Sequence, residues 1–203
     1  MCSIIGSFDK DKIVELCELN AYRGQYTHSV NYFDVNRGTI TIHRREGAVD
    51  YSTINIPQGN YCIVHMQAPT TENTGAIHPA YYEGSYLWHN GILKQKEVAR
   101  LKDVLQEITD WDTYLLLKAY SCGHDMGGID GSFSCLLYAD ASLTLFRNEI
   151  SPMFIDDDMS ISSTKFPGAV STNPNVFLTL NFQKKTVNAG KTFKTAENPY
   201  FFA

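Results

Sequence analysis

The chain has 203 residues, of which 43% are hydrophobic and 19% are charged, and its formal net charge is −5. This length accommodates a single domain over 1–203 with its own core, and it leaves no room for a second catalytic domain. Basic residues form short doublets such as Arg44-Arg45 and Lys184-Lys185 but no long basic face, which disfavours nucleic-acid binding, and no apolar run is long enough to cross a bilayer.

The cysteines indicate neither a disulfide framework nor a zinc ribbon. Their number is odd and no CxxC spacing occurs among Cys2, Cys17, Cys62, Cys122 and Cys135. We therefore interpret the last four as small core residues. The start of the chain lacks a basic segment followed by a long apolar stretch, so we expect no signal peptide, a mature protein that keeps Cys2, and a cytoplasmic location.

The first part of the chain predicts short strands around one helix. Residues 2–8 suit a buried strand, and Ile13, Leu16 and Cys17 have helical spacing within 12–20. Further stretches rich in β-branched and aromatic residues, separated by turn-forming residues, predict strands at 29–35, 39–44 and 61–66.

The rest of the chain predicts two consecutive helices and then a run of strands. A strand over 86–89 leads to Asn90-Gly91, and apolar residues then recur at helical spacing over 98–108 and 110–120. The pattern beyond residue 132 predicts strands at 133–138, 143–147, 153–155, 159–163 and 176–182. Strand-rich halves on either side of two helices favour an α+β layered fold.

Cys2 directly follows the initiator Met1. Removal of Met1 would leave a thiol and a free α-amine on one residue, and the amine, which titrates at about pH 7.7–8.0, could accept the thiol proton. That combination indicates amide chemistry by a nucleophile and its own base. The alternative for an isolated Met-Cys start is an ordinary buried cysteine on the first strand.

Five short motifs occur in an order along the chain that indicates a known family. They are Cys2-Ser3-Ile4-Ile5-Gly6, Arg23-Gly24, His65-Met66-Gln67-Ala68-Pro69-Thr70, His89-Asn90-Gly91 and Thr109-Asp110-Trp111-Asp112. Over nearly the whole chain this order resembles the class II glutamine amidotransferase domain, the N-terminal nucleophile (Ntn) type. The resemblance implies a four-layer αββα Ntn-hydrolase sandwich in which a cysteine thiolate attacks the side-chain amide of glutamine.

The resemblance also implies a catalytic set. Cys2 would form a thioester and release ammonia, and water would then release glutamate. The Asn90 side chain and the Gly91 backbone amide would bind the oxyanion, although Asn-Gly alone readily forms a tight turn. Arg23 matches an arginine that holds backbone near the nucleophile, and we interpret His65 and His89 as strand-end hydrogen-bonding residues and not as catalytic bases.

The same resemblance implies substrate-binding residues. Asp110 matches an aspartate that meets the ammonium of glutamine, with Asp112 interpreted as structural, and Thr70 matches a threonine that touches substrate. Gln67 stands where the family has an arginine for the substrate α-carboxylate. Losing that charged clamp would weaken glutamine binding, unless Gln67 itself donates one bond or Arg44 or Arg45 replaces the clamp in space.

Three functions remain open on these residues. The leading hypothesis is a stand-alone enzyme that hydrolyses glutamine and supplies the ammonia to a separate synthase subunit. No metal or redox cofactor is implied. The second is a hydrolase of γ-glutamyl or other small amides, tolerated by Gln67. The third is a non-catalytic binding or regulatory protein that retains the fold.

Overall fold

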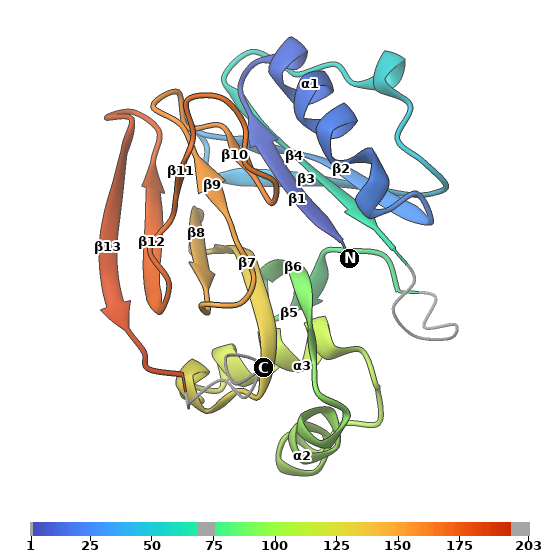
Figure 1. Ribbon diagram of the computed structural model, residues 1–203, viewed down its shortest axis with the longest axis vertical. Helices are drawn as coiled ribbons and strands as arrows, with labels where there is room; N and C mark the ends of the chain where they lie inside the picture. Colours follow the sequence, from blue (N-terminus) through green and yellow to red (C-terminus); the bar gives the residue numbers. More distant parts are fainter. Residues whose placement is uncertain (1, 69–75, 196–203) are drawn as a thin grey trace.

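Two antiparallel sheets form the centre of the protein (Figure 1). The computed structural model describes residues 2–68 and 76–195. One sheet has the strand order β11-β9-β10-β1-β4-β2-β3, and the other has the order β13-β12-β8-β7-β6-β5. Every pair of neighbouring strands is antiparallel.

The strands differ widely in length. The first sheet contains β1 (Ser3–Ser7), β2 (Thr27–Asp34), β3 (Thr39–Glu46), β4 (Asn60–Gln67), β9 (Phe154–Ile155), β10 (Ile161–Ser162) and β11 (Val170–Ser171). The second contains β5 (Ala80–Tyr82), β6 (Ser85–Leu93), β7 (Gly131–Ala139), β8 (Ser142–Arg147), β12 (Val176–Asn181) and β13 (Thr186–Thr192).

Helices cover the outer faces of both sheets (Figure 1). Helix α1 (Lys10–Asn20) packs on β1 and β4, whereas α3 (Asp112–Ser121) packs on β5 and β6 and also contacts α2 (Gln95–Leu105). Single 3-10 turns occur at Ala21–Arg23, Tyr51–Thr53 and Met126–Gly128. The order of layers is therefore helix, sheet, sheet, helix, which confirms the predicted αββα sandwich.

Three hydrophobic layers hold this stack together. Ile4 of β1 and Trp88 of β6 lie in the layer between the sheets, while Ile5 packs beneath α1 and Leu87 beneath α3. This division follows from the alternation of side chains along each strand. Adjacent residues of one strand therefore pack into different hydrophobic layers.

The sequence located most of these elements, with three informative differences. Asn90-Gly91 lies inside β6 and not in a tight turn, which rules out the turn alternative. Cys122 is exposed, so the interpretation of this cysteine as a core residue was wrong, while Cys17, Cys62 and Cys135 are buried as predicted. The strands β5, β11 and β13 were missed because two are very short and β13 is an exposed edge strand without alternation.

Gly6 provides a test of how tightly β1 is packed. A Cβ atom at this position would lie 2.5–2.8 Å from the ring and hydroxyl of Tyr61. That ring cannot move freely, because its hydroxyl donates to the Met159 carbonyl at 2.7 Å and its face packs against Phe182 at 4.5 Å between ring centroids. We therefore expect Gly6→Ala to lower the free energy of unfolding by about 1–3 kcal/mol, measured by urea denaturation followed by circular dichroism.

Gly128→Ala is the matched control. No heavy atom of the described residues lies within 4 Å of a Cβ built there, and its φ is not positive. The packing explanation would be contradicted if both variants changed the unfolding midpoint equally.

Candidate active site

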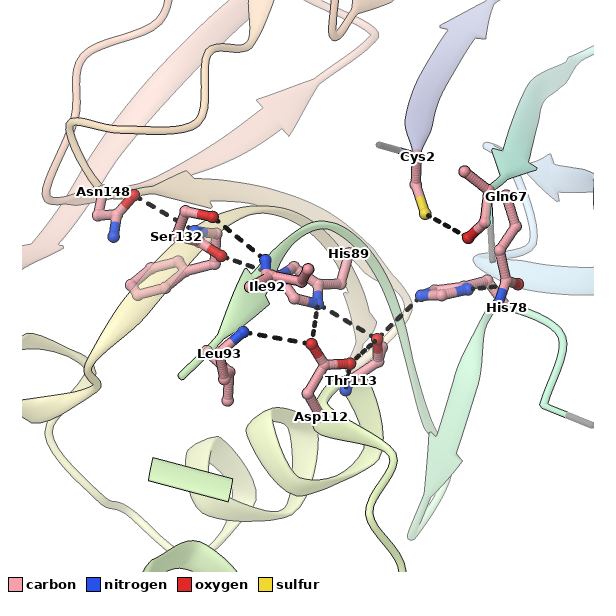
Figure 2. Close-up of polar contacts among 12 residues, drawn as sticks. Cys2, Gln67, His78, His89, Ile92, Leu93, Asp112, Thr113, Ser132 and Asn148 are labelled. Atoms are coloured by element: carbon pink, nitrogen blue, oxygen red, sulfur yellow. Dashed lines mark hydrogen bonds and ion pairs between the residues drawn. The ribbon is translucent and has the colours of Figure 1, made fainter. Parts of the chain in front are cut away.

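Cys2 directly precedes β1 and is buried, with 4% of its surface exposed. Its Sγ is 4.0 Å from the backbone carbonyl oxygen of Ala68 (Figure 2). Arg23 Nε donates to the carbonyl of Cys2 at 3.0 Å. Burial raises the pKa of the Cys2 thiol; the negative charge of Asp112 acts in the same direction, and the Arg23 guanidinium opposes it. Arg23 therefore contacts the backbone of the predicted nucleophile.

Asn90 and Gly91 lie on β6, which contacts β1 across the inter-sheet layer. His65 connects the two regions, because it is paired with Ile4 in the β1–β4 ladder and lies 3.1 Å, through Nε2, from the His89 carbonyl. Asn90 is only 3% exposed as a residue, and its side-chain amide, which makes no hydrogen bond to any described residue, is not among the fully buried polar groups and so reaches solvent. An amide held at this place without a protein partner is available to a ligand.

Gly91 is required by close packing. A Cβ atom at this position would lie 2.0 Å from the Ser132 carbonyl oxygen and 2.7 Å from His89 Nε2. No side chain fits there while β6 keeps its pairing with β7. The Ser132 carbonyl and the His89 ring can therefore lie this close to the Gly91 backbone only because the residue is glycine.

A chain of buried polar side chains runs beside these residues (Figure 2). His78 lies 3.0 Å from Gln67 Oε1 through Nδ1 and 2.9 Å from Thr113 Oγ1 through Nε2. Thr113 Oγ1 is in turn 3.2 Å from His89 Nδ1, and His89 Nε2 is 3.3 Å from the Ser132 carbonyl oxygen. This chain, together with Asp112 beside it, is called the histidine network below.

The Gln67 side chain is already used by the fold. Its Oε1 accepts hydrogen bonds from Thr27 Oγ1 at 2.9 Å and from His78 Nδ1, and its Nε2 donates to the Ala76 carbonyl at 3.2 Å. Gly24 packs so closely on the Gln67 backbone that a Cβ atom would lie 2.4 Å from its carbonyl carbon. Gln67 is thus a fixed, uncharged group at the end of β4.

The two neighbouring aspartates lie in different surroundings. The Asp110 side chain is 72% exposed and pairs with Lys102 at 2.6 Å, whereas Asp112 is 20% exposed and lies 3.9 Å from His89 Nδ1. Asp112 also accepts hydrogen bonds from the backbone amides of Thr113 and Leu93. Asp112 therefore adjoins the histidine network and Asp110 does not, and substrate binding by Asp110 stays a prediction.

Two further predictions concern residues around this region. The Arg44 guanidinium donates to the carbonyls of Ile77 and Pro79, at 2.9 Å and 2.7 Å, so it holds the segment before β5 in place. It is therefore engaged with backbone and is not a free substitute for the missing clamp. Thr70 lies outside the described residues, and its role stays a prediction.

The sequence did not reveal the histidine network. Its members come from the end of β4, the segment before β5, β6 and the start of α3, and no motif spacing connects them. Only the pairing of the strands and the packing of α3 on β5 and β6 bring them together. The one available signal was that several histidines fall in apolar stretches that must be buried.

The fold resembles those of solved enzymes. Glutamine phosphoribosylpyrophosphate amidotransferase from B. subtilis, in complex with ADP and GMP, aligns with a TM-score of 0.68 and 15% identity over 94% of this chain. A structure described as the allosteric regulatory enzyme of purine biosynthesis aligns with a TM-score of 0.67 and 16% identity, also over 94%. The chain has the fold of a class II glutamine amidotransferase domain.

This fold occupies only part of those enzymes, since the chain spans 49% of the length of each. No family model matches the sequence, and no curated protein gives a significant match. None of the helices described is both long enough and apolar enough to span a membrane. Within 2–68 and 76–195, no three His, Cys, Asp or Glu side chains are arranged to hold a metal ion.

The raised pKa of Cys2 predicts how the thiol reacts. Because the thiolate is the nucleophile and burial disfavours it, we expect alkylation of Cys2 by iodoacetamide to accelerate about tenfold per pH unit between about pH 7 and 8.5. The rate is measured by intact mass in a Cys122→Ser background, because Cys122 is the exposed thiol that would otherwise react.

The double variant Cys2→Ala, Cys122→Ser is the control and should acquire no adduct. Cys17, Cys62 and Cys135 are buried, and burial raises the pKa of each, to about 12 for Cys17. A rate that levels off below pH 8 would show that the Cys2 thiol is more acidic than its surroundings indicate.

Proposed function

We propose that the protein is a cysteine-nucleophile amidohydrolase that converts glutamine to glutamate and ammonia. The observation that supports this most directly is the Asn90 side-chain amide on β6, which has no hydrogen-bond partner among the described residues and is not sealed from solvent. β6 contacts β1, the strand that begins directly after Cys2. The fold resembles that of an amidotransferase, and in this chain it places Cys2 directly before β1.

The proposed reaction uses the groups of one residue. After removal of Met1, the α-amine accepts the thiol proton, Sγ attacks the amide carbon, and the tetrahedral oxyanion forms. Collapse of this intermediate breaks the C–N bond, and ammonia leaves with the transferred proton. Water then attacks the thioester, which releases glutamate and regenerates the thiol.

The Asn90 side chain and the Gly91 backbone amide would stabilise the oxyanion. Preorganised donors of this type favour the transition state because they need no reorganisation when the charge develops. Arg23 would keep the Cys2 backbone in position through its bond to the Cys2 carbonyl. A separate synthase subunit would be the acceptor of the ammonia.

A second candidate function is hydrolysis of γ-glutamyl or other small amides, and Gln67 favours it for those amides whose α-carboxylate is absent or blocked. This residue is uncharged, and its Oε1 and one Nε2 hydrogen are used by Thr27, His78 and Ala76. A substrate without a free α-carboxylate at this place would not need the missing charge, which is worth about 1.5–3 kcal/mol for each charge-assisted hydrogen bond.

Hydrolysis assays on the processed protein separate these candidates. We expect glutamate and ammonia to form from glutamine, and we expect Cys2→Ala to abolish the reaction, since no other described cysteine lies at the start of β1. Intact mass first verifies that Met1 is absent. Preferential hydrolysis of γ-glutamyl amides would support the second candidate, and no Cys2-dependent hydrolysis of any amide would favour a non-catalytic binding protein.

The proposed oxyanion role predicts the effect of Asn90→Ala. We expect kcat to fall by about 10²–10³-fold, because one preorganised donor is lost, with the fold unchanged by circular dichroism. Asn188→Ala, which removes the same amide from the exposed strand β13, is the matched control and should retain wild-type kcat. Equal kcat for Asn90→Ala and wild type would exclude Asn90 as an oxyanion donor.

A further inference from the structure

β6 has a neighbouring strand on only one side where it carries Gly91. β5 pairs with β6 no further than Leu87, whereas β7 pairs with it as far as Leu93. Over 88–93 the edge of β6 that faces away from β7 therefore has no neighbouring strand among the described residues, and we call it the free edge. Backbone groups on such an edge are satisfied by side chains or remain open to a ligand.

The backbone amides of Leu93 and Lys94 show which residues face the free edge. Successive residues of an antiparallel strand turn their backbone groups to opposite edges. The Lys94 amide donates to the carbonyl of Asp130, directly before β7, at 3.1 Å. The Leu93 amide instead donates to Asp112 Oδ2, at the start of α3, at 3.3 Å (Figure 2). The odd-numbered residues of this stretch therefore face the free edge.

The His89 carbonyl follows the same alternation and is bound by a side chain of the other sheet. It lies 3.1 Å from Nε2 of His65, on β4. Because a carbonyl oxygen can only accept, Nε2 carries the ring hydrogen and donates it. Burial lowers the pKa of His65 to about 3, so the ring is neutral and its Nδ1 has no hydrogen. The free edge is thus attached at residue 89 as well as at residue 93.

Gly91 lies midway between these two attachments. By the same alternation its backbone amide faces the free edge. Its cross-strand partner Phe133 is turned the other way, since the Phe133 carbonyl accepts from the Asn148 amide at 3.0 Å. No side chain of the described residues accepts a hydrogen bond from the Gly91 amide. An open amide between two attached neighbours is preorganised for a ligand oxygen.

His65 is not the residue that packing alone would select. Its ring is fully buried, and Nδ1 has no hydrogen-bond partner among the described residues. Such an atom is destabilising, and an apolar side chain would avoid it. His78 stacks on the ring, with 3.9 Å between centroids and 21° between planes, which fixes its orientation. An imidazole at this place is explained if the site needs its contact with the His89 carbonyl.

We propose that His65 and Asp112 are positioning residues that hold the free edge of β6, so that the Gly91 amide stays directed at the oxyanion. This inference rests on the proposed amidohydrolase function. His65 attaches the edge to β4, where it pairs with Ile4, two residues beyond Cys2. Asp112 attaches the edge to α3. The two contacts together fix the distance between the nucleophile and the oxyanion donor.

NMR of the ligand-free protein tests both attachments without any assay of activity. We expect the Leu93 amide to exchange slowly with solvent and to lose this protection in Asp112→Ala, while the Gly91 amide exchanges fast in both proteins. We expect the His89 carbonyl carbon to change its chemical shift in His65→Leu and to keep it in His65→Gln, whose amide can donate from the position of Nε2. A protected Gly91 amide, an unprotected Leu93 amide in the wild type, or a His89 carbonyl that does not respond to His65→Leu would overturn the proposal.

Kinetics test the consequence for catalysis. We expect kcat to fall by about 10–10²-fold in His65→Leu and in Asp112→Ala, because a small misplacement of a preorganised group is costly. KM should change less than about threefold, since the oxyanion develops only in the transition state. His65→Gln should restore kcat to within about threefold of wild type. The matched controls, His43→Leu on β3 and Asp103→Ala on α2, remove exposed side chains and should leave both constants unchanged.

The positioning role and the proposed function fail separately. Wild-type kcat in variants that have lost the NMR signatures would overturn the positioning role, as would a loss in His65→Leu that His65→Gln does not restore. Circular dichroism verifies the fold of each variant, and Asp112→Ala tests the same prediction from the other attachment if His65→Leu does not fold. Absence of any amide hydrolysis by the wild type would remove the proposed function, while the NMR results would still decide the attachments.

Discussion

The pairing of β1 on both edges is the constraint on which the rest of the structure depends. β10 and β4 flank this five-residue strand, and each of its residues is buried. Ile4 packs against the second sheet, and Ile5 packs beneath α1. Because the strand is fixed on every side, Cys2 at its start has a defined position although it lies next to the chain terminus.

The histidine network shows how polar chemistry is accommodated in such a core. A buried polar group without a partner costs about 1–3 kcal/mol, so His78, Thr113, His89 and Gln67 are stable here only because they satisfy one another. Their bonds connect β4, the segment before β5, β6 and α3. Asn90, the neighbour of His89 on β6, is not part of the network and has no hydrogen-bond partner among the residues described.

The sequence predicted the layers of this fold better than its site. The apolar runs around Ile63 and Trp88 and the helical spacing around Leu16 indicate burial directly, so the long strands and the helices were located. Strand pairing is non-local, and nothing in the sequence shows that His65 lies opposite Ile4 or that α3 brings Thr113 between two histidines. The motif order identified Cys2, Asn90 and Gly91 as candidates, but the surroundings of Gln67 depended on packing.

The bonds of Arg44 join the two sheets at their edges. This residue belongs to β3, the last strand of the first sheet, and it holds the carbonyls of Ile77 and Pro79 just before β5, the last strand of the second. Separating the sheets would therefore expose the apolar layer between them and also release these carbonyls. The two sheets should therefore unfold together. Spectroscopic probes placed on each sheet should report one common unfolding transition.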